Sequence, residues 1–210
     1  MAKKTDGFFS ADEKHRIEAA VTEAEQRTSG EIVPMVVEAA YDYPRAEIIG
    51  GGFFALAFAS LFSWWWWHAS LWAFLPAFLL LYLPCKWLLR FTPALKRKLI
   101  AEAEIAAEVE EKALVAFVEQ GLHHTRDNTG ILILICLFEH RVEVLADRGI
   151  NALVPKETWQ EIVAIVTAGL RRGQACEALC RAVERCGQIL AEHFPRREDD
   201  TDELPNLIID

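Results

Sequence analysis

Two long apolar runs in the middle of the chain constrain its fold more than any other feature. Residues 48–67 read IIGGGFFALAFASLFSWWWW, which contains no charge and, at about 1.5 Å per residue, matches a hydrocarbon core of about 30 Å. Residues 71–89 form a second run, whose only charge, Lys86, lies near its end, where a long side chain reaches the interface. The pattern predicts a transmembrane helical hairpin over residues 46–91. The alternative is a buried hairpin of a soluble protein, although core helices are seldom apolar on all sides.

The turn between the two runs, residues 68–70, indicates the orientation of the hairpin. Tryptophans lie on both sides of it, at Trp64, Trp65, Trp66, Trp67 and Trp72, as is typical of a headgroup boundary. The turn has no Lys or Arg, whereas the opposite flank is basic, so the positive-inside rule predicts that this flank faces the cytoplasm. Its basic residues are Arg45, Lys86, Arg90, Lys96, Arg97 and Lys98. We therefore expect an integral membrane protein with two spans and both termini in the cytoplasm.

Charge and cysteine content exclude several classes of function. The net charge of −9 and the pI near 5.2 argue against a nucleic-acid partner, because phosphate neutralisation needs a basic surface. The five cysteines include no C-x-x-C pair, so neither a disulfide framework nor a zinc knuckle is indicated. Cys176 and Cys180 share a helix face, which we interpret as helix packing rather than metal binding. Free thiols agree with a reducing compartment.

The segments on either side of the hairpin have the pattern of one split domain. Ser10 begins a capping box before a helix predicted over residues 11–27. Residues 31–38 are rich in branched side chains and predict a strand, which we expect at a sheet edge because Pro34 lacks an amide hydrogen. After the hairpin, residues 93–120 have helical spacing and predict one long helix.

The rest of the chain completes an α/β pattern. Residues 131–138, ILILICLF, predict a central strand covered on both faces, and residues 141–147 alternate as a half-exposed antiparallel partner would. Helices follow over residues 156–170 and 174–192, and we expect the acidic tail to be irregular. The first strand reaches the central one through the hairpin and the long helix, so this pair can be parallel.

These elements predict an α/β fold, namely an α/β/α sandwich with a small mixed sheet that is interrupted by the transmembrane hairpin. Residues 1–45 and 92–195 are the two parts of the domain, residues 46–91 are the hairpin, and residues 196–210 are the acidic tail.

Polar residues should gather at one edge of this sheet, where the first and central strands begin and the third strand ends. Carboxylate, amide and hydroxyl oxygens together are the ligands that calcium or magnesium requires, and such a site also supports phosphoester hydrolysis. The alternative is that these residues cap helix ends and turns. The candidate metal ligands are Glu31, Asp127, Asn128 and Asp147, with support from Ser29, Arg148, Asp202 and Glu203.

Three segments of the sequence stand out together: EAEQRTSGEIVPMVVE, TRDNTGILILICLFEHRVEVLADRGI, and HFP followed by DELPN. In combination they resemble the TPM domain family, in its bacterial membrane-embedded branch. The resemblance implies an α/β/α sandwich, with residues 127–130 as the polar entry to the central strand and Glu139 with Arg141 as an acidic-x-Arg hairpin. Members of the family have been labelled phosphatases and calcium binders, and others act as assembly partners of membrane complexes. Many relatives place the domain outside the cytoplasm, whereas here a hairpin splits it.

Our leading hypothesis is a non-catalytic, membrane-tethered binding or assembly factor of the bacterial inner membrane. It rests on the hairpin and on the lack of a nucleophile–base motif in the sequence. The expected partners are the lipid bilayer and unidentified membrane proteins, and the expected cofactor is calcium or magnesium. The alternative is a divalent-metal-dependent phosphatase that uses Asp127 and Asp147, supported by Glu31 or Asn128.

Overall fold

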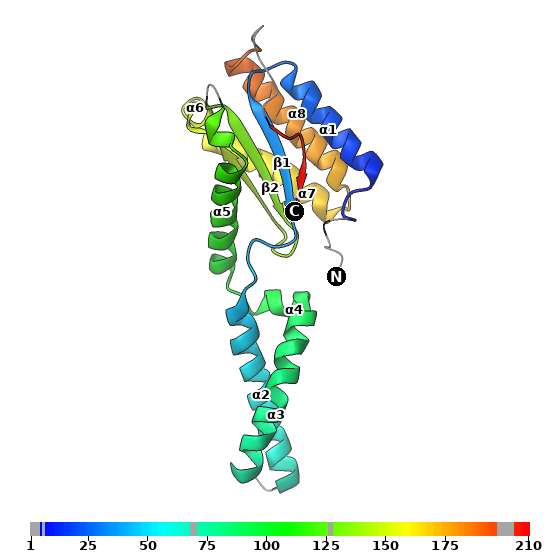
Figure 1. The fold of residues 1–210 in the computed structure, drawn as a ribbon, viewed down its shortest axis with the longest axis vertical. Helices are drawn as coiled ribbons and strands as arrows, with labels where there is room; N and C mark the ends of the chain where they lie inside the picture. Colours follow the sequence, from blue (N-terminus) through cyan, green and yellow to red (C-terminus); the bar gives the residue numbers. More distant parts are fainter. Residues whose placement is uncertain (1–4, 6, 68–70, 126–127, 197–203) are drawn as a thin grey trace. The chain divides into compact units, whose positions relative to one another are not determined.

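The computed structural model describes residues 5, 7–67, 71–125, 128–196 and 204–210. The chain divides into two compact units, each described by itself: the first holds residues 1–40 and 107–210, and the second holds residues 41–106. Figure 1 gives the labels of the elements. In chain order they are α1 (Ala11–Glu25), β1 (Glu31–Val37), α2 (Pro44–Trp67), α3 (Leu71–Phe91), α4 (Pro93–Lys98), α5 (Glu102–Glu119), η1 (Leu122–His124), β2 (Gly130–Cys136), β3 (Arg141–Ala146), α6 (Arg148–Asn151), α7 (Lys156–Arg171), α8 (Ala175–His193) and β4 (Ile208–Ile209).

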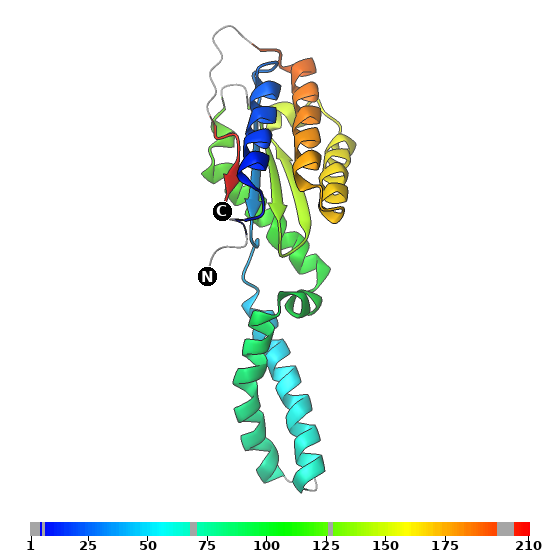
Figure 2. The ribbon, with the colours of Figure 1, turned by 90° about the vertical axis from the view of Figure 1, so that its right-hand side faces the viewer.

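The first unit is built on a four-stranded sheet in the order β3-β2-β1-β4. β1 pairs parallel with β2 and with β4, while β2 pairs antiparallel with β3. Helices α1, α7 and α8 cover one face and α5 lies on the other (Figures 1 and 2). The α/β/α arrangement with a small mixed sheet, expected from the sequence, is therefore confirmed.

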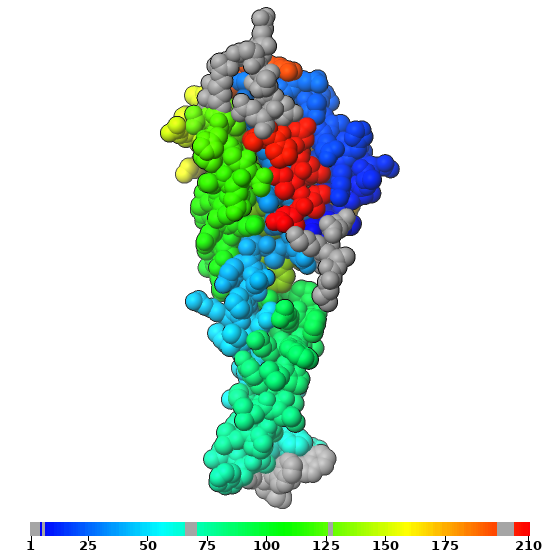
Figure 3. Space-filling view, viewed as in Figure 1, coloured from blue at the N-terminus to red at the C-terminus, as the bar shows by residue number. Residues whose placement is uncertain are grey.

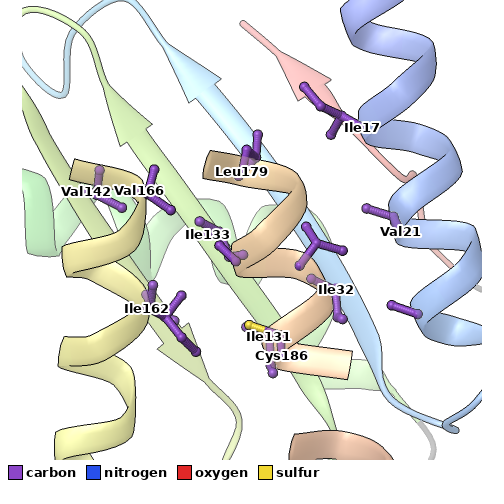
Figure 4. Packing of buried hydrophobic residues seen from close by; sticks show 14 of the residues in the cluster. Ile17, Val21, Ile32, Ile131, Ile133, Val142, Ile162, Val166, Leu179 and Cys186 are labelled. Carbon is purple, nitrogen blue, oxygen red and sulfur yellow. The ribbon is translucent and has the colours of Figure 1, made fainter. Parts of the chain in front are cut away.

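The main core lies between the sheet and the three-helix layer. Every residue of β1 and of β2 is buried, whereas β3 alternates between buried and half-buried positions, as its sequence predicts. Ile131 and Ile133 of β2 face Ile162 on α7 and Leu179 and Cys186 on α8 (Figure 4). Large branched side chains from strands and helices therefore interlock in this layer.

The prediction that the first strand is an edge strand is wrong, because β4 lies beyond it. The reason is local. Along a strand, amide hydrogens point alternately to the two sides, and Ile32, two residues before Pro34, donates away from β2 to the Glu25 carboxylate at 3.0 Å. Pro34 lacks a donor on that same side, and β4 pairs only further along, at Met35 and Val36. The first half of β1 thus has the edge character that its proline indicates.

Two further expectations need correction. The predicted helix over residues 93–120 is two helices, α4 and α5, separated by residues 99–101. The tail is not wholly irregular, since β4 extends the sheet and lies between α5 and α1 on the surface (Figure 3). Asn206 ties the same segment to α1 by donating to the Thr22 hydroxyl at 2.9 Å.

The second unit is an antiparallel helical pair in which α2 buries small residues, α3 buries Cys85 and Leu89, and most other large apolar residues are exposed. A stripe of small residues at four-residue spacing on α2 is buried: Gly51, Ala55, Ala59 and Ser63. A methyl group at Gly51 would lie 3.0 Å from Lys86 Cα, so the backbones approach closely. Both helices are long and apolar enough to cross a membrane. Most of their surface is not buried within this chain, since 28% of the most apolar stretch of α2 and 6% of that of α3 are buried.

Candidate functional site

The predicted convergence of three strand ends at one edge of the sheet is confirmed. Glu31 opens β1 opposite Gly130, which opens β2, and the end of β3 lies beside the same point because Asp147 N–H donates to the Gly130 carbonyl at 2.9 Å. Glu31 N–H donates to the Thr129 carbonyl at 3.2 Å. Polar residues far apart in sequence are therefore neighbours at this edge.

Buried threonine hydroxyls at the edge hold backbone groups together. The Thr28 hydroxyl donates to the Phe194 carbonyl at 2.6 Å and accepts from Gly30 N–H at 3.2 Å. The Thr129 hydroxyl donates to the Ser29 carbonyl at 3.3 Å. These contacts join the start of β1 to the end of α8 and to the start of β2. They support the capping alternative for the hydroxyls, because a polar group buried at a turn must find a backbone partner.

Asn128, Asp147 and Arg148 form a group beside the start of β2. Asn128 has a φ of +56°, a left-handed conformation that Asn tolerates better than most residues. Its Oδ1 accepts from Arg148 Nε at 3.2 Å. Asp147 is the N-cap of α6, and its Oδ1 accepts from Arg148 N–H at 2.6 Å. Its Oδ2 is buried and has no hydrogen-bond partner among the described residues. One Asp147 oxygen therefore serves as a helix cap.

Glu31 lies in a different group, on a cavity of about 360 Å³. The cavity is lined by Thr22, Glu25, Gln26, Thr28, Gly30, Glu31 and Arg196. Asn128, Asp147 and Arg148 do not line it. The edge thus divides the predicted ligands into two groups, with Glu31 in the cavity beside Glu25 and with Asp147 and Asn128 outside it.

Glu25 is a cavity residue that sequence reasoning missed. It lies in the last turn of α1, where a negative charge opposes the helix dipole, and that turn has no basic residue. An acid at such a position needs a specific partner, and Glu25 has one in Ile32 N–H. An acidic residue in the last turn of a predicted helix was therefore the sequence feature that could have identified Glu25.

The described residues by themselves do not complete a divalent-cation site. Within the described ranges no group of three or more His, Cys, Asp or Glu side chains is placed to hold a metal, whereas calcium takes six to eight oxygens. The buried Asp147 Oδ2 and the cavity carboxylates are the donors that fit such an ion. Asp127, Asp202 and Glu203 lie outside the described residues. The calcium or magnesium site stays a prediction.

The cysteines have the chemistry of packing groups. Burial raises the pKa of Cys136 and of Cys186 to about 12, and that of Cys176 to about 11. Their thiols are protonated at neutral pH, and a thiol is a poor nucleophile or metal ligand in that form. Cys176 and Cys180 point at the Glu13 and Arg16 carbonyls of α1, at 3.7 and 3.8 Å. The interpretation of this pair as helix packing agrees with these contacts.

At the opposite edge of the sheet, a buried carboxylate fixes the turn between β2 and β3. Glu139 is fully buried, and its Oε1 accepts from Ala40 N–H, just beyond β1, at 2.9 Å. Backbone bonds from Leu137 to Val37 and from Phe138 to Glu38 reinforce the same junction. Glu139 therefore anchors the segment that leaves the sheet.

Comparisons with known proteins agree with this fold. The TPM domain family model matches residues 97–189, which include α5, β2, β3, α6 and α7 but neither α1 nor β1. The NMR structure of the BA42 protein from the psychrophilic bacterium Bizionia argentinensis is similar to this chain, with a TM-score of 0.60 and 21% identity, over 96% of this chain and 94% of that one. No curated protein matches. The structural similarity shows a shared fold.

Proposed function

Since this chain carries a TPM domain, we propose that it is a membrane-tethered, non-catalytic module that binds membrane protein partners beside the bilayer. The tether is the hairpin of α2 and α3, and the binding element is the α/β unit. The proposal further places the protein in the bacterial inner membrane with both termini in the cytoplasm.

The observation that carries the proposal is the inverted packing of the hairpin. The buried stripe of α2 is made of small residues, while most large apolar residues point outward, as Leu80 does with an exposed fraction of 78%. Exposing so much apolar surface to water is unfavourable. Lipid tails solvate such a surface, and close packing of the two backbones then holds the helices together. The charge difference between the two ends of the hairpin supports the orientation.

A surface suited to a protein partner lies on α5. Leu114, Val115 and Val118 are exposed there. The same helix carries six glutamates and one lysine. Burial raises the pKa of Glu143 on β3, and the nearby Glu110 carboxylate raises it further. Apolar residues with an acidic rim complement a basic amphipathic segment, of the kind found on the cytoplasmic side of membrane proteins.

Two experiments test this proposal. A photo-crosslinking residue at Val118 in the full chain in cells should yield adducts with membrane proteins, and the same residue at exposed Glu18 on α1 is the control. Equal adducts from both positions would argue against a specific surface. Secondly, a phosphatase reporter fused after Asp210, active only outside the cytoplasm, should stay inactive, and an active reporter would reverse the orientation.

A divalent-metal-dependent phosphatase is the second candidate function, favoured by the buried Asp147 Oδ2 and the two cavity carboxylates. The full-length protein is titrated with calcium and magnesium and assayed on a generic phosphoester, alongside Asp127→Asn and Asp147→Asn. Metal-dependent turnover that is lost in both variants would overturn the non-catalytic proposal. If neither ion changes the protein or its turnover, the phosphatase candidate and the metal site both fail.

A further inference from the structure

A short helix is fixed firmly against the open end of the hairpin. Lys96 of α4 donates from Nζ to Glu47 Oε1 at 2.6 Å and to the Asp42 carbonyl at 2.5 Å. Leu99, just after α4, packs on α2 so closely that a methyl group at Gly50 would lie 2.6 Å from its Cδ1. An ion pair and an apolar contact therefore both tie α4 to α2, which fixes where the other α4 side chains lie.

The cations around this junction fall into two classes. Lys96 pairs with Glu47, with 12% and 13% of the side chains exposed, and Arg97 pairs with Glu102 at 3.8 Å. By contrast, three exposed cations make no ion pair within the described part of the chain: Arg45 in the first turn of α2, Arg90 in the last turn of α3, and Lys98 at the end of α4. The hairpin end thus presents positive charge that its own carboxylates do not neutralise.

Exposed apolar and aromatic side chains accompany these cations. Trp87 and Phe91 are exposed on α3 and share a helix face because they lie four residues apart, and Arg90 lies three residues after Trp87. Leu99 is also exposed beside Lys98. Aromatic and aliphatic side chains next to Lys or Arg are typical of the boundary between the hydrocarbon core and the headgroups of a membrane.

We propose that Arg45, Arg90 and Lys98 form a collar that binds the headgroup phosphates of anionic phospholipids. The inference rests on the proposed insertion of the hairpin, since that insertion brings the collar to headgroup level. Each basic residue at an anionic surface favours binding by about fivefold. The collar thereby adds a preference for lipid charge to the hydrophobic tether.

The test compares two lipids on the full-length protein. Protein in detergent is titrated with phosphatidylglycerol and with phosphatidylcholine of identical acyl chains, and retained lipid is counted by native mass spectrometry. We expect preferential retention of phosphatidylglycerol, reduced by about fivefold for each cation removed, up to Arg45→Gln/Arg90→Gln/Lys98→Gln. The control, Lys156→Gln/Arg171→Gln/Arg172→Gln, removes three exposed cations from the α/β unit and should keep the preference.

Each outcome decides the inference. Equal retention of the two lipids by the unchanged protein overturns it, and so does an equal loss of preference in the control. If the collar variant fails to fold, the charge-retaining variant Arg45→Lys/Arg90→Lys/Lys98→Arg decides, because the collar predicts that its preference is kept. Failure of the unchanged protein to insert into vesicles of either lipid would overturn the membrane tether itself, whereas insertion into both without lipid preference would overturn the collar alone.

Discussion

The two units of this chain use apolar side chains in opposite ways. In the α/β unit the large branched residues of the main core point inward, as Ile133 and Ile162 do, and helices α1, α7 and α8 turn polar faces outward. In the hairpin the buried positions of α2 are small, as at Ala55 and Ala59, and Leu89 is buried on α3, whereas most large apolar residues, such as Leu80, point outward. Helices of similar length thus follow opposite rules within one chain.

This contrast is what the proposed insertion of the hairpin into a membrane requires, because the two units would then lie in different media. Water drives large apolar side chains into a core, whereas lipid offers no such drive and leaves close packing and polar contacts to hold helices together. The following predictions separate these two sources of stability.

The largest effect is expected in the core of the α/β unit. Ile133→Ala removes buried methyl and methylene groups and leaves a cavity, so it should lower the free energy of unfolding by about 2–5 kcal/mol. The outward-facing Leu80→Ala should change it by less than about 0.5 kcal/mol. Urea titration in detergent, followed by circular dichroism, measures both. If the two variants lost equal free energy of unfolding, the proposed difference in packing between the α/β unit and the hairpin would be contradicted.

The next effect concerns the ion pair at the base of the hairpin. Lys96→Met leaves the nearly buried Glu47 carboxylate without its cation and should destabilise the hairpin by about 3 kcal/mol. Arg97→Met is the matched control, because its partner Glu102 is 70% exposed and such a pair contributes less than about 1 kcal/mol. Thermal unfolding in detergent compares the two. An equally damaging Arg97 variant would show that general charge loss, not burial, is responsible.

Close packing of α2 on α3 predicts a smaller loss. Gly51→Leu forces the backbone away from Lys86 and should cost about 1–3 kcal/mol. Gly52→Leu is the neighbouring control, because a methyl group there meets nothing within 4 Å. The same thermal assay applies, and the contact stripe would be refuted if the Gly52 variant were the more damaging one.

The smallest effect should depend on pH. Burial and Glu110 raise the pKa of Glu143, so the folded state holds this proton to higher pH than the unfolded state does. Stability therefore falls as the pH rises above the ordinary value of 4.5 and through the raised pKa. Glu143→Gln should be more stable than the unchanged protein at pH 7, by about 0.5 kcal/mol or less, and equal to it below pH 4.5. A gain that persists in acid would contradict this charge effect.

Features with local causes could be predicted from the sequence. The capping box at Ser10, the uncharged run of α2 and the unbroken apolar run of β2 each reflect neighbours in the chain. The break after α4 could not be predicted, since it accompanies the packing of Leu99 on Gly50, about fifty residues away. β4 escaped prediction because two isoleucines in an acidic tail form a strand only where β1 offers an open edge.

The candidate site was predictable to a similar extent. The shared edge follows from strand directions, which the pattern of elements indicates. The separation of Glu31 from Asp147 could not be read from the sequence, because it depends on whether each carboxylate turns toward α1 or caps α6. Glu25 was missed because its partner, Ile32 N–H, belongs to a strand edge that only the folded sheet defines.

The contact between Lys96 and Asp42 also affects the order in which the protein can form. β1 is synthesised well before its parallel partner β2, since Val37 and Gly130 lie 93 positions apart. Closing a loop of this length costs about 4 kcal/mol of chain entropy. Once the hairpin has formed, the Lys96–Asp42 contact has already closed 54 of these positions. The remaining closure is then easier by roughly 0.8 kcal/mol. Early formation of the hairpin would in this way favour pairing of β1 with β2 in the sheet that the hairpin interrupts.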